Sequence, residues 1–151
     1  MELREEPLDG PVGQELLAAF FTEMLPRYPG WRPEIGPSAE PHEFCRPTGT
    51  FVVAYEEGRP VGCGGVKRLD DHAAEIKRVY VAPEVRRTGV ARGIVEHLEN
   101  FARDTGYGVV RLDTGDQQPE ALALYRASGY RAIADYNANP EASFWFEKAL
   151  A

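Results

Sequence analysis

Val81-Ala-Pro-Glu-Val-Arg-Arg-Thr-Gly-Val-Ala91 is the stretch that decides the fold, because it joins an apolar strand to an amphipathic helix through a short turn. Upstream, Ile76 to Val81 is rich in β-branched and aromatic residues, and Pro83 ends the strand because proline lacks a backbone donor. Downstream, apolar residues recur at helical spacing at Val90, Ala91, Ile94, Val95, Leu98, Phe101 and Ala102. The pattern predicts a strand to Val81 and a helix that begins near Thr88.

The turn between them is suited to binding an anion. A helix start leaves its first backbone N–H groups unpaired and carries a partial positive charge. Gly89 lacks a Cβ and would let an anion approach those groups, while Arg86 and Arg87 add fixed positive charge beside them. An ordinary capped helix with two solvated arginines would have the same residues, so this segment alone leaves both interpretations open.

Three segments together resemble one protein family. Arg86-x-x-Gly89-x-Ala91 is similar to the Gln/Arg-x-x-Gly-x-Gly/Ala signature of the GNAT superfamily of N-acetyltransferases, where it binds the pyrophosphate of acetyl-coenzyme A. Glu75 to Pro83 resembles the fourth strand of that superfamily, and Ala121-x-x-x-Tyr125-x-x-x-Gly129-Tyr130 resembles its A-x-x-x-Y-x-x-x-G-F/Y segment. The segments occur in the family's order, and the resemblance spans roughly Phe51 to Leu150.

Composition predicts one soluble domain over residues 1–151, since a chain of 151 residues is long enough for one core. A net charge of -7 disfavours nucleic-acid binding, which relies on a basic surface, and favours a cationic acceptor only weakly. The N-terminus lacks the features of a secretory signal and no segment is long and apolar enough for a membrane span, so we expect a cytoplasmic protein without a membrane partner.

The first half of the chain predicts a helix followed by antiparallel strands. After a weakly patterned strand in residues 1–7, apolar spacing predicts a helix over Val12 to Leu25 that ends before Pro26. Residues 26–50 are rich in proline and should be a loop, with one short helix around residues 39–44. Strands are predicted at residues 51–55, 61–69 and 74–81, as an antiparallel meander.

The second half predicts a parallel crossover. Gly106 suits the end of the helix that begins near Thr88, and a strand follows at residues 109–113. A further helix should run from Pro119 to Ser128, before strands at 130–134 and 143–150. The fold class is α/β with a mixed sheet: six or seven strands, mostly antiparallel, one central parallel pair and about four helices. The GNAT acyl-CoA N-acyltransferase fold has this architecture.

The resemblance implies where acetyl-coenzyme A would bind. In the family the two parallel strands separate, and the pantetheine arm of the cofactor enters the gap and pairs with the fourth strand. The corresponding backbone here is Val79, Tyr80 and Val81. The pyrophosphate would be bound by Arg86, Arg87, Thr88, Gly89, Val90 and Ala91. Many family members have Asn where this chain has Gln118, whose longer amide side chain could make similar hydrogen bonds.

Glu75 and Tyr125 are the catalytic residues that the resemblance implies. Glu75 occupies the position of a general base that removes the amine proton directly or through water; the alternative is a surface glutamate paired with Lys77 on the same strand face. Tyr125 would protonate the departing thiolate and contact the cofactor sulfur; the alternative is a tyrosine that packs in the core. A backbone N–H near Val81 would hold the oxyanion.

The sequence does not identify the acceptor, and the residues that would bind it follow only from the resemblance. By resemblance the acceptor site would include Tyr28, Trp31 and Tyr136, although for Trp31 we prefer the alternative that it packs the proline-rich loop. Metal catalysis is not expected, because His42, His72 and His97 are widely separated in the sequence. The predicted function is direct transfer of an acetyl group from acetyl-coenzyme A to a primary amine of a small molecule or peptide. The alternative is a non-catalytic acyl-coenzyme A sensor or regulatory module, and a homodimer through residues 143–146 is possible by analogy.

Overall fold

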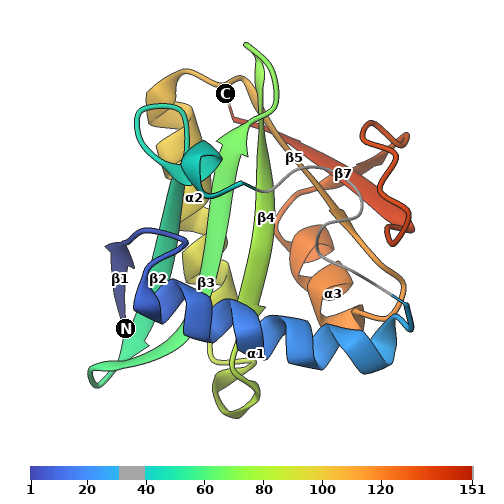
Figure 1. Cartoon of the computed structure of the whole chain (residues 1–151). Coiled ribbons are helices and arrows are strands. Elements are labelled where there is room, and N and C mark those ends of the chain that lie inside the picture. The colour runs from blue at the N-terminus through green and yellow to red at the C-terminus, as the bar shows by residue number, and fades with distance from the viewer. Residues whose placement is uncertain (31–39, 151) are drawn as a thin grey trace.

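The computed structural model describes residues 1–30 and 40–150 of the chain. Over these residues, a single seven-stranded sheet has the order β1-β2-β3-β4-β5-β7-β6 (Figure 1). The strands are β1 (Glu2–Glu5), β2 (Thr50–Glu56), β3 (Arg59–Arg68), β4 (Ala73–Val81), β5 (Val109–Thr114), β6 (Arg131–Ile133) and β7 (Phe144–Ala149). The mixed sheet predicted from the sequence is confirmed.

Strand pairing is antiparallel except at the centre of the sheet. β2 to β4 form the predicted meander, β1 pairs antiparallel with β2 at the edge, and β7 lies between β5 and β6 with antiparallel neighbours on both sides. β4 and β5 are the parallel pair, and the connection between them contains a helix, as a parallel crossover requires. One parallel pair at the centre is therefore also confirmed.

The described residues contain three α-helices: α1 (Pro11–Arg27), α2 (Val90–Thr105) and α3 (Pro119–Ala127). Two 3₁₀ turns accompany them, η1 (Pro41–Phe44) and η2 (Pro83–Val85). The expected fourth helix, around residues 39–44, is only the single turn η1. Pro47 follows closely, and because the residue before a proline is kept out of the α region, the turn cannot extend into a helix.

Helices cover both faces of the sheet, with α1 crossing one face and α2 lying on the other (Figure 1). The alternation of β2 shows why: Val52 packs in the cluster that contains Ile94 of α2, and Val53 packs in the cluster that contains Leu17 of α1. Because both faces are covered, Phe51, Val52 and Val53 are fully buried. Each such side chain contributes about 1.5–3 kcal/mol through burial.

Two helix boundaries differ from the sequence prediction. α1 continues through Pro26 to Arg27, and the Tyr28 N–H still donates to the Met24 carbonyl oxygen at 2.9 Å. A proline in the last turn removes only one backbone hydrogen bond, so it does not end the helix there. α2 begins at Val90 rather than near Thr88, because Gly89 is in the left-handed conformation (φ 94°) and cannot be part of the helix. Gly106 ends α2 as predicted (φ 104°).

None of the helices within residues 1–30 and 40–150 is long and apolar enough to cross a bilayer.

Candidate active site

The parallel strands β4 and β5 separate soon after they meet. Their register runs only from Ala73 opposite Val109 to Glu75 opposite Arg111, although β4 continues to Val81. Beyond Glu75, β4 pairs with β3 alone among the described strands. The edge of β4 that faces β5 therefore presents backbone N–H and C=O groups without a strand partner, which an extended ligand can pair with.

A local distortion accompanies this separation. The pairing of β3 with β4 shifts its register between Cys63 and Gly65, and opposite this shift Arg78 adopts a left-handed conformation (φ 62°). An extra residue of this kind bends a strand and increases its twist. The guanidinium group of Arg78 lies over the Phe21 ring of α1, 4.9 Å from its centroid. The bulge lies in the part of β4 that no longer pairs with β5.

A cavity of about 800 Å³ occupies the region where the strands separate. Its walls come from α1, β4, the segment that leads into α2, the end of β5, α3 and residues 139–142. This volume is within the range of small-molecule and cofactor pockets. The residues predicted from the sequence to touch the cofactor divide into two groups: Val79, Tyr80, Val81, Arg86, Arg87, Gly89, Ala91, Gln118 and Tyr125 line the cavity, whereas Thr88 and Val90 do not.

The two residues outside the lining have local structural tasks. The Thr88 hydroxyl donates to the Val85 carbonyl oxygen at 2.5 Å, which closes the turn before α2. Val90 is buried in the core beneath α2. The side chains of Thr88 and Val90 thus contact the protein itself, and only their backbone groups lie at the start of α2.

The start of α2 has the features of an anion site. Its N-cap, Gly89, supplies no side-chain cap, and the first intrahelical bond runs from the Gly93 N–H to the Gly89 carbonyl oxygen at 3.0 Å. The N–H groups of the preceding helical residues are therefore without intrahelical partners. A Cβ placed on Gly89 would meet nothing within 4 Å. Within the protein the glycine is needed for its positive φ, and the predicted approach of an anion to these N–H groups stays a prediction.

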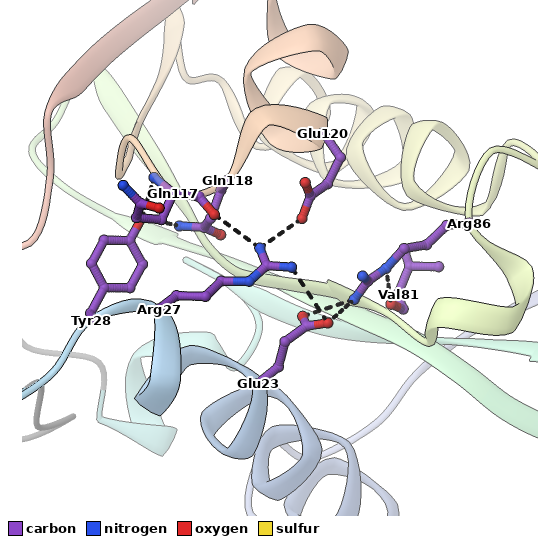
Figure 2. Close-up of polar contacts among 8 residues, drawn as sticks. All are labelled: Glu23, Arg27, Tyr28, Val81, Arg86, Gln117, Gln118 and Glu120. Atoms are coloured by element: carbon purple, nitrogen blue, oxygen red, sulfur yellow. Dashed lines mark hydrogen bonds and ion pairs between the residues drawn. The ribbon is translucent and has the colours of Figure 1, made fainter.

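Arg86 is held in place by α1. Its Nη2 donates to both carboxylate oxygens of Glu23, at 2.6 and 2.8 Å, and its Nε donates to the Val81 carbonyl oxygen at 2.9 Å (Figure 2). Glu23 lies 63 residues earlier in the chain, and no sequence pattern predicts this contact. Contacts through two different nitrogens, Nη2 to Glu23 and Nε to Val81, fix the plane of the guanidinium group.

The same end of α1 contacts the start of α3. Arg27 Nη1 donates to Glu120 Oε1 at 2.9 Å and to the Gln117 carbonyl oxygen at 3.1 Å (Figure 2). The Tyr28 hydroxyl accepts the Gln117 N–H at 3.0 Å and lies 3.5 Å from Gln118 Nε2. We name these contacts, together with the Glu23–Arg86 pair, the α1 bridge. It joins the segment before α2 to the start of α3 beside the cavity.

Tyr28 was predicted to contact the acceptor and Gln118 the cofactor, whereas in the structure both take part in the α1 bridge. Both line the cavity, but the Tyr28 hydroxyl is used in the α1 bridge. Gly115 accommodates it closely, because a Cβ there would lie 2.0 Å from the Tyr28 hydroxyl oxygen. Trp31 lies outside the described residues, and Tyr136 is not part of the cavity lining.

Tyr125 lies on α3 against the inner wall of the cavity. Its side chain is 5% exposed, and its ring packs edge-on to Tyr130, with centroids 5.6 Å apart. Burial, with a smaller contribution from the charge of Asp113, raises the pKa of Tyr125 well above its ordinary value. The phenol therefore carries its proton at neutral pH, as a proton donor must. The two interpretations of Tyr125 are compatible, since one ring can pack in the core and line a cavity.

Glu75 is buried behind the cavity wall. It is 1% exposed and is absent from the lining, so it is not the surface glutamate of the alternative interpretation. One carboxylate oxygen accepts the Tyr136 hydroxyl at 2.6 Å and the Asn137 side-chain amide at 3.1 Å, while Lys77 Nζ lies 3.9 Å from the other. Burial and the negative charge of Glu75 raise the pKa of Tyr136, so the phenol remains a donor.

Asp113 is the residue that the sequence analysis missed. It stands near the end of β5, is half-buried, and lines the cavity. Asn137 and Asn139 donate side-chain N–H groups to its two carboxylate oxygens, the second at 3.2 Å. The alternation of Val110, Leu112 and Asp113 places the carboxylate on the face opposite the α2 core. That alternation, at the strand end beside the parallel pair, was the signal that could have found it.

Other candidate chemistry is not supported by the described part of the chain. No group of three or more His, Cys, Asp or Glu side chains within residues 1–30 and 40–150 is arranged to hold a metal ion. Cys45 is exposed, and burial raises the pKa of the Cys63 thiol to about 12, so that thiol stays protonated at neutral pH.

Comparisons with a family model, with protein sequences and with solved structures all find acetyltransferases. The acetyltransferase (GNAT) family matches residues 14–130. An IAA acetyltransferase of Azospirillum brasilense is 32% identical, over 97% of this chain and 95% of that protein. The uncharacterized N-acetyltransferase YedL of Escherichia coli (strain K12) is 31% identical, over 94% of this chain and 91% of that protein. Among solved structures, an aminoglycoside 6'-N-acetyltransferase complexed with coenzyme A has a TM-score of 0.74 at 19% identity, with 100% of this chain and 98% of that chain covered.

Proposed function

The chain belongs to the GNAT acetyltransferase family, and from that premise we propose that this acetyl-coenzyme A-dependent N-acetyltransferase moves the acetyl group directly to a primary amine. The observation that carries the proposal is the cavity between β4 and β5. It brings the start of α2, the unpaired edge of β4 and the hydroxyl-bearing ring of Tyr125 to one continuous space.

The residues that line this space fit acetyl-coenzyme A in three respects. The arginines Arg86, Arg87 and Arg92 and the unpaired N–H groups of α2 suit the pyrophosphate. The free edge of β4 suits the two amides of an extended pantetheine arm, which need donors and acceptors in a strand-like register. The volume of about 800 Å³ leaves room for an acceptor beside the thioester.

The chemistry follows from the groups at the inner end of the cavity. Bound acetyl-coenzyme A supplies an activated acetyl group as a thioester. The N–H groups of β4 that face the gap are placed to stabilise an oxyanion, and Tyr125 donates a proton to the leaving sulfur. The amine must lose a proton, and two carboxylates, Glu75 and Asp113, are joined through Asn137 at this end. A base drawn from this pair completes the mechanism.

A non-catalytic acyl-coenzyme A sensor would bind the same cofactor and release no thiol when amines are supplied. The two functions differ in what they require of Tyr125. A sensor needs only the packing of its ring, whereas the transferase also needs its hydroxyl group.

We therefore expect Tyr125→Phe to reduce kcat by about 10²–10⁴-fold, the usual contribution of an acid catalyst, while the Kd for acetyl-coenzyme A stays unchanged. The measurement is thiol release with a panel of primary amines, beside cofactor titration. Tyr107→Phe is the matched control, since its hydroxyl donates to the Thr48 carbonyl oxygen at 2.8 Å and Tyr107 is not in the cavity lining. Undiminished turnover in Tyr125→Phe would remove Tyr125 from the mechanism, and a wild-type protein that binds cofactor but acetylates no amine would be a sensor.

A further inference from the structure

The two carboxylates at the inner end of the cavity differ in access. Asp113 is half-buried and lines the cavity, as does Asn139, which donates to it at 3.2 Å. Glu75 is 1% exposed and lies outside the lining. The side-chain amide of Asn137 donates to one oxygen of each carboxylate, so it connects the accessible group to the buried one.

Asp113 also differs in its partners from Glu23 and Glu120 of the same lining. Glu23 and Glu120 in the same lining are paired with Arg86 and Arg27, respectively. Among the ion pairs of the described residues, none includes a cation at 4.0 Å or less from Asp113, whose partners are two neutral amides. Each carboxylate oxygen can accept two hydrogen bonds, so one accepted bond leaves capacity for a ligand.

Asn137 is itself held in a fixed orientation. Its side-chain oxygen accepts the Trp145 indole N–H at 2.9 Å, which leaves its Nδ2 to face the two carboxylates. The hydroxyl of Tyr136 fills a further acceptor site of Glu75 at 2.6 Å. Glu75, Tyr136 and Trp145 together therefore determine where Asn137 lies, and through it where Asp113 lies.

From this geometry, and resting on the proposed transferase function, we infer that Asp113 is the catalytic base that receives the acceptor's amino group, whereas Glu75 is a positioning residue that acts through Asn137. The acceptor that this site fits is an ammonium-bearing primary amine. A carboxylate with no cationic partner within residues 1–30 and 40–150 attracts such a group and repels an acceptor whose amine adjoins a carboxylate.

The proton transfers balance with this assignment. Asp113 takes one proton from the ammonium group and passes it to solvent, which leaves a neutral amine. As the C–N bond forms and the thioester C–S bond breaks, Asp113 takes a second proton from nitrogen and Tyr125 gives its hydroxyl proton to the sulfur. The Asp113 carboxylic acid then returns that proton to the Tyr125 phenolate. The charge of Asp113 contributes to the raised pKa of Tyr125, which places the two groups within electrostatic reach.

Several other ionisable groups share this cavity or its hydrogen-bonded cluster and would contribute to any pH profile. They are Glu23 on α1, Glu75 and Lys77 on β4, Arg111 on β5, Tyr125 on α3, Tyr136 and Glu141 before β7, and Glu147 on β7. A changed pH profile in a variant of Asp113 therefore identifies Asp113 only if variants of Glu75 and of an exposed carboxylate outside the cavity lining keep the wild-type profile.

The test compares Asp113→Asn, Glu75→Gln and the control Asp116→Asn, an exposed carboxylate three residues farther along. Spermidine, tyramine and a lysine peptide are the probe amines, and the pH dependence of kcat/KM is measured by thiol release. We expect Asp113→Asn to lower kcat/KM by about 10²–10⁴-fold and, with kcat/KM expressed per neutral amine, to abolish the decline at acidic pH. Glu75→Gln should keep that decline and lose about tenfold or less, and Asp116→Asn should match the wild type.

Asp113→Glu keeps the carboxylate and guards against a folding defect in Asp113→Asn. We expect it to retain the acidic decline at reduced kcat. The assignment is overturned if Glu75→Gln abolishes the decline while Asp113→Asn keeps it, or if Asp113→Asn turns over like the wild type. A wild-type protein whose melting temperature rises with acetyl-coenzyme A but which acetylates none of the amines would instead refute the transferase function, and the role of Asp113 with it.

Discussion

Glu23 holds Arg86 through both carboxylate oxygens before any ligand arrives, and this single pair changes how the coenzyme segment works. Together with the Nε contact to Val81, the pair orients the guanidinium group, but the carboxylate also neutralises much of its charge. Attraction for a pyrophosphate at this end of the cavity therefore depends more on Arg87, Arg92 and the start of α2 than the sequence motif alone suggests. Arg86 contributes orientation more than net charge.

Glu5 gives a residue-scale prediction about stability. Hydrogen bonds from Arg46, at 2.7 and 2.8 Å, and from Thr50 lower the pKa of Glu5 from 4.5 to about 2, and His97 adds a weaker contact. A lowered pKa in the folded state stabilises the protein above the unfolded pKa, and that stabilisation is lost as the pH falls through the folded pKa. Arg46 is 65% exposed, so solvent screening limits the effect to about 1 kcal/mol.

We expect the free energy of unfolding of the wild type to exceed that of Glu5→Gln above pH 4.5, and the difference to shrink as the pH falls from 4.5 towards 2. Urea denaturation at a series of pH values measures it. Glu57→Gln, in the exposed turn between β2 and β3, is the control and should show no such convergence. A constant difference between wild type and Glu5→Gln across this range would show that the pKa of Glu5 is not lowered in the folded state.

At the scale of elements, α1 is more than a cover for the sheet. Its last turns supply Glu23, Arg27 and Tyr28 to the α1 bridge, which ties the segment before α2 to the start of α3 (Figure 2). β4 and β5 separate between those two points, so the bridge fixes the distance across the gap that their own hydrogen bonds no longer determine. Extension of α1 through Pro26 to Arg27 is what brings Arg27 to its partners Glu120 and Gln117.

The start of α2 gives an element-scale prediction with a matched control. Gly89 and Gly58 both have a positive φ, 94° and 79°, and at both a Cβ would meet no atom within 4 Å. Gly89→Ala and Gly58→Ala should therefore each cost about 1–2 kcal/mol of stability through backbone strain alone. Only Gly89→Ala should also weaken acetyl-coenzyme A binding, because it disturbs the N–H groups at the start of α2. Thermal unfolding measures the loss of stability, and calorimetric titration measures the affinity for acetyl-coenzyme A. Equal affinity in the two variants would exclude the start of α2 as the anion site.

At the scale of the whole molecule, the fold was predictable because its signals are local. The alternation of the strands, the helical spacing of the apolar residues in α2 and the glycine that ends α2, Gly106, each lie within one segment. The order of strands and helices then limited the possible topologies. The site was predictable only where a motif marked it, as at Tyr125. Asp113 was marked only by the alternation of β5, whereas Glu23 and the α1 bridge arise from contacts between residues 63 to 93 positions apart, which no local pattern encodes.

The central claim is that the cavity between β4 and β5 is the acetyl-coenzyme A site, and the melting temperature tests it most directly. Acetyl-coenzyme A at about 100 times its Kd should stabilise the protein by about 2.7 kcal/mol, which raises the melting temperature by about 5–10 °C. ATP carries phosphates but no pantetheine arm to pair with β4, and should give a much smaller shift at the same concentration. A saturable shift specific to acetyl-coenzyme A is the result that the structure predicts. No shift at millimolar acetyl-coenzyme A, or an equal shift with ATP, would contradict it.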